Sequence, residues 1–317
     1  MVPILAAMMI LAQPPTPAAA PPAATVSQPS NRTVRADFRF AGVGRRHPVL
    51  YETARSLVLI RGTVAGRSAW ILLDTGAGRT IVDAGLAHDA GLHIEPAPMP
   101  IVTPSGALAG HRVDDLDIAI ADQLTIHLSL AGSADLGPVS RLLGRPVGAV
   151  LGWDILGRIA FLVDPRGPAL SLAPSGLLPP PPGAHSVGLS ARGRIPVSID
   201  GTQVSFAVDL GSNHVVGLRA DLWDSLAPKG ADTRPWTVSH AQGQGEDSRL
   251  GVLPEIMLGD VPIGNVSVVL EAVAPGDGDG HVGMGLLGHM VFLVDAGQGR
   301  LWFRVATPPA PRLEAGR

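Results

Sequence analysis

The chain has 317 residues, 46% of them apolar, and its formal net charge is −3. This length and apolar content predict one large domain or two lobes with buried cores, and they exclude a disordered chain. The slightly acidic balance argues against a nucleic-acid binder, and the lack of cysteine excludes disulfides, thiolate metal sites and cysteine nucleophiles.

An apolar run at residues 2–12 is followed by a segment rich in proline and alanine. The run is too short to cross a bilayer, but it suits the centre of a signal peptide. No lysine or arginine precedes Arg32, so a disordered apolar N-terminus or a misassigned start codon is the alternative. We expect residues 1–20 to be a signal peptide. The protein is then exported, periplasmic or secreted, with no membrane span after signal removal.

Short strand-like segments make up most of the remaining chain. They are rich in Val, Ile and Phe and are separated by glycine and proline; the clearest are residues 56–64, 68–74, 195–200, 204–209, 267–273 and 290–295. Ala65-Gly66 and Asp200-Gly201 join two such pairs as hairpin turns. Brief helical patterns cover residues 83–91, 153–158 and 219–226. The sequence therefore predicts an all-β fold with short helices.

One pattern occurs twice along the chain. Residues 61–82 align with residues 196–217 at a constant offset, with glycines and one carboxylate at matching positions. Residues 150–172 align in the same way with residues 281–303, and both segments contain the letters FLVD. Two collinear blocks of this kind indicate an internal duplication.

A proline-rich segment separates the two copies, and four consecutive prolines fit neither a helix nor the interior of a sheet. We expect a leader with the first strands at residues 21–52 and an N-terminal lobe at residues 53–173. A linker at 174–186 joins it to a C-terminal lobe at 187–306, and a tail follows at 307–317.

Asp74 ends an apolar segment and enters a turn of small residues that runs to Gly78. A buried carboxylate needs donors to replace its water, and such a turn supplies backbone N–H groups and the hydroxyl of Thr75. A surface Asx turn is the alternative for Asp74 taken alone.

The duplication places Asp74 opposite Asp209 if the two copies pack about an approximate two-fold axis. Two carboxylates in one site cannot both ionise cheaply, so the pair holds one proton and acts as acid and base together. Such a pair can bind a water, take its proton as the water attacks a carbonyl, and protonate the leaving nitrogen.

These motifs resemble those of aspartic proteases of the retropepsin/pepsin clan. Residues 72–82, LLDTGAGRTIV, resemble the family's Asp-Thr-Gly-Ala motif, and residues 149–156, AVLGWDIL, resemble its later apolar-apolar-Gly segment. The resemblance spans residues 53–306 and is to the bacterial aspartyl protease family with duplicated retropepsin-like lobes in one chain. It implies a bilobal, pepsin-like double β-barrel with two pseudo-symmetric lobes and a peptide cleft between them.

The resemblance also implies roles for individual residues. The catalytic pair would be Asp74 and Asp209, and the loops that hold it would be supported by Thr75, Gly76, Gly211 and Ser212. Leu210 stands where the family usually has Thr or Ser, and its side chain cannot make the inter-lobe hydrogen bond of a hydroxyl. Ser212 has Ala77 as its counterpart, so we expect Asp209 to gain an extra donor and Asp74 to carry the shared proton more often.

Two glycine-containing segments lie where such enzymes place flaps over the cleft, residues 101–110 and residues 237–246. Gly106 and Gly243 are the flap candidates, and ordinary hairpin loops are the alternative. The flap tyrosine of pepsin-like enzymes has no counterpart, because Tyr51 is the only tyrosine.

Other motifs do not predict a cofactor or a metal. Residues 283–288, GMGLLG, match a dinucleotide fingerprint but precede a strand-like segment instead of a helix. The acidic loop at residues 276–281 lacks the twelfth-position carboxylate of an EF-hand, and the ten histidines form no metalloprotease motif.

The sequence thus predicts an aspartic endopeptidase that acts on peptides or unfolded proteins, as a monomer, without cofactor, metal or nucleic acid. A peptide-binding relative without useful catalysis is the main alternative, favoured by Leu210, and a structural envelope module is the other. Pairing of like lobes between chains is the alternative to a monomer.

Overall fold

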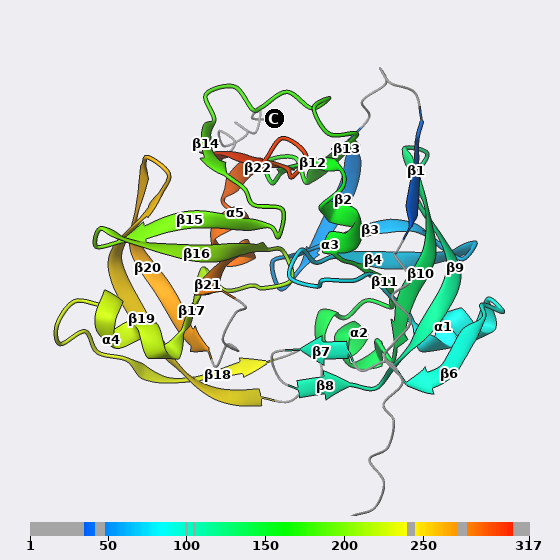
Figure 1. Ribbon diagram of the computed structural model, residues 1–317, viewed down its shortest axis with the longest axis horizontal. Coiled ribbons are helices and arrows are strands. Elements are labelled where there is room, and N and C mark those ends of the chain that lie inside the picture. The colour runs from blue at the N-terminus through cyan, green and yellow to red at the C-terminus, as the bar shows by residue number, and fades with distance from the viewer. Residues whose placement is uncertain are drawn as a thin grey trace, which may run out of the picture. The chain divides into compact units, whose positions relative to one another are not determined.

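Strands make up most of the protein, and its helices are few and short (Figure 1). The structure is a computed structural model that describes residues 35–41, 48–98, 101–103, 106–239, 245–271 and 278–306, all within one compact unit. The predicted all-β fold with short helices is confirmed. The expected signal peptide, most of the leader and the tail at residues 307–317 lie outside the described residues.

The first half of the chain forms a closed barrel of six strands. Their order is β3-β4-β11-β5-β10-β9, and β9 pairs back onto β3 through Thr63 with Ala119 and Val64 with Ile118. The strands are β3 (Leu57–Val64), β4 (Arg67–Leu73), β5 (Ile81–Asp83), β9 (Gly110–Ile120), β10 (Leu124–Ala134) and β11 (Val147–Leu151). Alternate residues at the end of β9 and at the start of β10 are buried, among them Leu116, Ile118 and Ile126 in the core.

The second half of the chain repeats this barrel. Its order is β15-β16-β21-β17-β20-β19, and β19 closes onto β15 through Val197 with Leu258 and Ser198 with Met257. The strands are β15 (Arg194–Ile199), β16 (Thr202–Asp209), β17 (Val216–Arg219), β19 (Gly245–Leu258), β20 (Val261–Glu271) and β21 (Gly280–Gly283). Parallel pairing joins β4 to β11 and β16 to β21 at equivalent places, so the predicted duplication is present in the topology as well.

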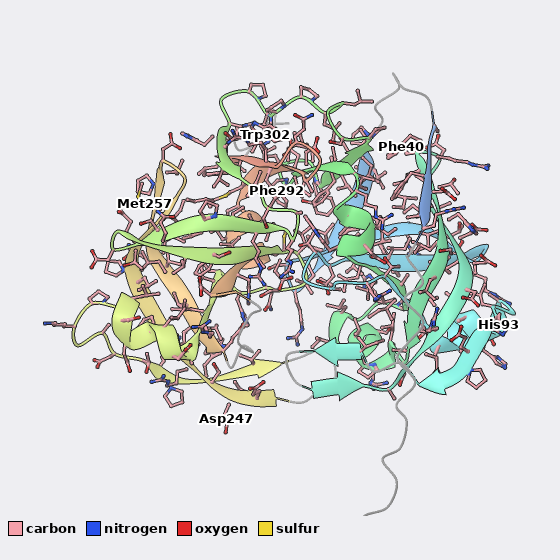
Figure 2. All side chains as sticks on the ribbon, viewed as in Figure 1. Phe40, His93, Asp247, Met257, Phe292 and Trp302 are labelled. Atoms are coloured by element: carbon pink, nitrogen blue, oxygen red, sulfur yellow. The ribbon has the colours of Figure 1, made fainter. Side chains whose placement is uncertain are left out.

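A shared sheet joins the two halves, in the order β14-β23-β22-β12-β13-β2. The two FLVD segments form its central antiparallel pair, with Leu162 opposite Leu293, as expected for copies related by a two-fold axis. Figure 2 labels Phe292 and Trp302 on its neighbouring strands β22 and β23. The strands are β2 (Val49–Ala54), β12 (Ala160–Asp164), β13 (Ala169–Ala173), β14 (His185–Gly188), β22 (Met290–Asp295) and β23 (Arg300–Val305).

The two predicted hairpin turns are confirmed, between β3 and β4 and between β15 and β16. Ala65 and Gly66 have φ of 49° and 76°, and Asp200 and Gly201 have φ of 47° and 78°. Positive φ at both central residues is what a two-residue type I′ turn requires, which explains why glycine occupies the second position in both copies.

The remaining strands extend the barrels or stand apart: β1 (Ala36–Phe40), β6 (Ile94–Pro98), β7 (Ile101–Thr103), β8 (Gly106–Leu108) and β18 (Arg234–Ser239). Between β13 and β14 no helix or strand forms, and β14 begins at His185, so that it includes the last two residues of the expected linker. In the described part of the chain, no helix is long and apolar enough to cross a membrane.

The helices are α1 (Ala84–Asp89), α2 (Gly137–Leu143), α3 (Trp153–Leu156), the 3-10 helix η1 (Ala220–Leu222), α4 (Trp223–Leu226) and α5 (Met284–Leu287). The three predicted helical stretches are present, and α2 and α5 were missed. A helix of four residues such as α5 is too short to show helical periodicity. Its equivalence to α3 would have revealed it, because both begin after a glycine, Gly283 and Gly152.

Candidate active site

Two carboxylates from the two barrels meet between the ends of equivalent strands. Asp74 follows the last residue of β4, and Asp209 is the last residue of β16. A Cβ on Gly76 would lie 2.6 Å from Asp209 Oδ1, and a Cβ on Gly211 would lie 2.2 Å from Asp74 Oδ1. Each loop therefore packs its glycine on the carboxylate of the other loop.

Backbone N–H groups hold both carboxylates in place. Gly76 N and Ala77 N donate to Asp74 Oδ1 at 2.9 and 3.0 Å. Gly211 N donates to Asp209 Oδ1 at 2.8 Å. The turn after each strand thus supplies the donors that replace water, which answers why a charged residue can end an apolar strand.

The environment of Asp74 raises its pKa well above the ordinary value of a carboxyl. The pKa of Asp74 is raised to about 7: burial is the largest cause and the charge of Asp209 adds to it, while the N–H groups of Ala77 and Gly76 act in the opposite direction. A carboxyl with this pKa stays protonated at acidic and near-neutral pH. The expectation that Asp74 carries the shared proton stays a prediction.

Thr75 ties the two loops together. Its hydroxyl donates to the carbonyl of Val208 at 2.6 Å and accepts from Leu210 N at 2.9 Å. The bond from Leu210 comes from its backbone, so the leucine side chain does not affect it. Leu210 is fully buried and contributes packing where a hydroxyl would contribute a further hydrogen bond.

We expect Thr75→Val to lower the free energy of unfolding by about 2–4 kcal/mol, because two buried backbone groups lose their partner. Thr75→Ser keeps the hydroxyl and should lie within about 1 kcal/mol of the wild type. Urea denaturation of the three proteins measures both effects. Equal losses in the two variants would show that packing of the methyl group, and not the hydrogen bonds, is what matters.

A second glycine motif in each copy packs against the backbone of the loop that follows the carboxylate. A Cβ on Gly152 would lie 2.5 Å from the carbonyl carbon of Arg79, and one on Gly283 would lie 2.4 Å from the carbonyl oxygen of His214. Equivalent hydrogen bonds follow each glycine, from Trp153 N to Ala77 O at 2.7 Å and from Met284 N to Ser212 O at 2.7 Å. The close approach explains the glycine in both copies.

Thr80 and Asp154 complete this support in the first copy, and sequence patterns did not point to them. Thr80 is fully buried and donates to Asp154 Oδ1 at 2.8 Å, while Gly152 N donates to Thr80 Oγ1 at 3.2 Å. Burial raises the pKa of Asp154, and the hydrogen bonds from Thr80 lower it.

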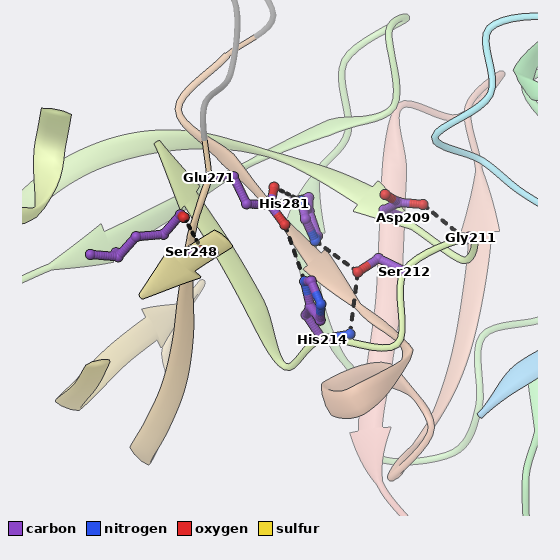
Figure 3. A network of polar contacts seen from close by, with 8 residues as sticks. Asp209, Gly211, Ser212, His214, Ser248, Glu271 and His281 are labelled. Carbon is purple, nitrogen blue, oxygen red and sulfur yellow. Dashed lines mark hydrogen bonds and ion pairs between the residues drawn. The ribbon is translucent and has the colours of Figure 1, made fainter. Parts of the chain in front are cut away.

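Ser212 does not occupy the place expected for it. Its Oγ lies 2.9 Å from His281 Nε2 and accepts from His214 N at 3.2 Å (Figure 3). Among the hydrogen bonds of the described residues, none joins Ser212 to Asp209. The extra donor expected for Asp209 is therefore absent, because the loop turns the hydroxyl of Ser212 toward the histidines.

The structure describes one of the two flap candidates. Gly106 lies in β8, which pairs with β7 as a separate two-stranded hairpin, with Gly106 opposite Thr103. Gly243 lies outside the described residues.

A surface depression of about 580 Å³ lies away from the carboxylate pair. The β15–β16 hairpin lines it, with Arg194, Gln203 and Ser205 among its residues. The carboxylates are not part of its lining, so we place the chemistry at the pair of loops instead.

Comparison with curated proteins finds no match for this chain. Comparison with models of protein families does find a match. The aspartyl protease family matches residues 60–154 and residues 195–291, which together make up more than half of the chain. Each match contains one loop of the pair, with Asp74 in the first and Asp209 in the second. The chain therefore belongs to the aspartyl protease family, with two copies of the family's lobe in one polypeptide.

Proposed function

We propose that the protein is an aspartic endopeptidase that hydrolyses peptide bonds with a water activated between Asp74 and Asp209. The observation that carries the proposal is the crossed packing of the two loops, in which Gly76 lies on Asp209 and Gly211 lies on Asp74. This packing holds two carboxylates in one partly buried site.

The proton distribution supports a division of roles. Asp74, whose pKa is raised to about 7, acts as the acid, and Asp209 acts as the base. Asp209 takes a proton from the bound water as the water oxygen attacks the peptide carbonyl. Asp74 donates its proton to the carbonyl oxygen as the charge develops there. Collapse of the tetrahedral intermediate breaks the C–N bond. The proton taken by Asp209 passes to the leaving nitrogen, and one hydroxyl of the intermediate returns a proton to Asp74, which restores the pair.

We infer that an extended segment of peptide or unfolded protein is the substrate, and that the β7–β8 hairpin with Gly106 acts as a flap over it. Gly243 is the equivalent candidate in the second copy. We also propose that the enzyme is an exported monomer, which rests on the apolar run at residues 2–12 and on the presence of both lobes in one chain.

The test is cleavage of a denatured protein by the full chain between pH 3 and pH 8.5. Since the working pair needs its proton on Asp74, cleavage should persist up to near-neutral pH. Above pH about 7 it should fall by about tenfold per pH unit, because Asp74 loses the proton that it must donate. Mass spectrometry of the products measures internal cleavage. A rate that rises with pH above 7 would contradict the assignment of the acid.

The alternative is a peptide-binding protein without useful catalysis, and the apolar side chain of buried Leu210 is the observation that favours it. The same experiment separates the two. Peptide binding by calorimetry with no cleavage at any pH would support the binder and contradict the endopeptidase.

A further inference from the structure

Three metal-ligating side chains converge beside the loop that carries Asp209 (Figure 3). His214 lies in the loop after β16, Glu271 ends β20, and His281 lies in β21. One ligand atom from each lies within 4.8 Å of the others. The three side chains are only 16%, 19% and 13% exposed, so the cluster is not a chance meeting of surface charges.

We propose that His214, Glu271 and His281 bind a divalent transition ion of the zinc class. Zinc takes imidazole nitrogen at about 2.0–2.1 Å and carboxylate oxygen at about 2.0–2.2 Å in tetrahedral geometry, which places neighbouring ligand atoms about 3.3–3.5 Å apart. His214 Nδ1 lies 3.1 Å from Glu271 Oε1, and His281 Nδ1 lies 3.5 Å from Glu271 Oε2. The two imidazoles contact different oxygens of the one carboxylate, and one ligand atom from each of the three side chains lies within 4.8 Å of the others, so side-chain rotation must bring them to the spacing of the ion.

The contact of His281 with Ser212 leaves one ring nitrogen of His281 available to bind a cation. His281 Nε2 lies 2.9 Å from Ser212 Oγ, so its N–H can donate there and leave the lone pair on Nδ1 for a cation. The 3.5 Å from Nδ1 to Glu271 is long for a hydrogen bond. Ligating histidines usually donate their second N–H in this manner, which fixes both the tautomer and the ring orientation.

The two imidazoles lie next to each other and both contact the same carboxylate. The imidazoles of His214 and His281 stack with centroids 6.0 Å apart and planes inclined by 22°. Two imidazole nitrogens and one carboxylate oxygen form a known ligand set of zinc, which leaves a fourth position for water.

A glycine makes room for one of the ligands. Gly217 on β17 lies opposite His281 on β21, and a Cβ at Gly217 would lie 2.2 Å from His281 Cε1. The site also ties together three pieces of the second barrel: the loop after Asp209, the end of β20, and β21. A bound ion should therefore stabilise this barrel, whether or not the protein is a peptidase.

The ligands come from three separate strands or loops, and the chain spacing between them follows no metal motif. This is why the sequence predicted no metal. The proposal rests on the convergence of these side chains in the folded barrel, which the sequence does not display.

The experiment uses full-length protein freed of metal with a chelator and then titrated with zinc chloride in a calorimeter. We expect one ion per chain and a higher melting temperature with zinc. His281→Gln and Glu271→Gln should each weaken binding by at least about 10–100-fold. The matched control is His93→Gln, which removes a surface imidazole paired with Asp114 at 3.2 Å and should bind zinc like the wild type.

Cobalt supplies a second readout that does not depend on variants folding. Wild-type protein titrated with Co²⁺ should develop the visible absorption of a tetrahedral site, and zinc should abolish it by displacement. X-ray absorption of the wild-type zinc protein should show imidazole ligands. No binding at millimolar zinc, no imidazole ligands, or equal binding by wild type and both ligand variants would each overturn the proposal. Since none of these readouts uses cleavage, their outcome is independent of the proposed peptidase activity.

Discussion

Replacement of either carboxylate by its amide, Asp74→Asn or Asp209→Asn, is expected to lower kcat/KM by at least about 10³–10⁴-fold. Each amide removes one of the two proton-transfer groups and also the shared proton of the pair. The remaining carboxylate can still hold a water, but the acid and base steps can no longer be divided between two groups. Initial rates on a quenched peptide at pH 5 measure the effect.

Both variants should remain folded, which makes the loss of activity interpretable. An asparagine at position 74 keeps the Oδ1 that accepts from Gly76 N and Ala77 N. It also mimics the protonated acid. Because the folded-state pKa of Asp74 lies above the ordinary value, its contribution to stability is complete at low pH and is lost as pH rises through about 7. The Asp74→Asn variant should therefore be at least as stable as the wild type at pH 7.5.

Asp260→Asn is the matched control, since its carboxylate is 75% exposed and pairs only with His185 among the contacts of the described residues. It should cleave like the wild type. If either variant of the pair kept more than about a tenth of wild-type activity, the shared-proton mechanism would be wrong.

Addition of one methyl group at Gly211 is expected to lower cleavage by at least about 10²-fold, because small displacements of catalytic groups have effects of this size. The Cβ of Gly211→Ala would lie 2.2 Å from Asp74 Oδ1 and 2.4 Å from its Cγ, so the carboxylate must move. We also expect a loss of about 1–3 kcal/mol of stability from the overpacked loop. Cleavage kinetics and urea denaturation measure the two effects.

Gly78→Ala is the control for this substitution. Gly78 belongs to the turn after Asp74, and a Cβ there would meet nothing within 4 Å. The variant should keep nearly full activity and stability. Similar behaviour of Gly211→Ala and Gly78→Ala would mean that the crossed packing of the loops does not position the carboxylates.

The pairing of Asp74 with Asp209 could be predicted because the chain repeats itself. Two copies of one sequence pattern fold in the same way, and equivalent residues then face each other across a two-fold axis. The same argument explains the two barrels and the pairing of Leu162 with Leu293 at the centre of the shared sheet. The type I′ turns were also predictable, because glycine in a two-residue loop is a local signal.

Three features depended on the tertiary structure. The hydrogen bond between Leu210 and Thr75 forms because its donor is the backbone N–H of Leu210. The identity of the side chain at position 210 does not indicate whether a backbone group makes such a bond. Ser212 turns toward His281 and away from Asp209, since the register of β17 against β21 places that imidazole beside the loop.

The convergence of His214, Glu271 and His281 is the third feature, and it too results from the pairing of strands that are far apart in the sequence. By itself, the sequence determined the duplication, the strands and the two carboxylate loops, because each depends on local pattern or on internal repetition. Only the tertiary structure decided which side chains meet in the second barrel, because the long-range strand pairing that brings them together leaves no trace in their spacing along the chain.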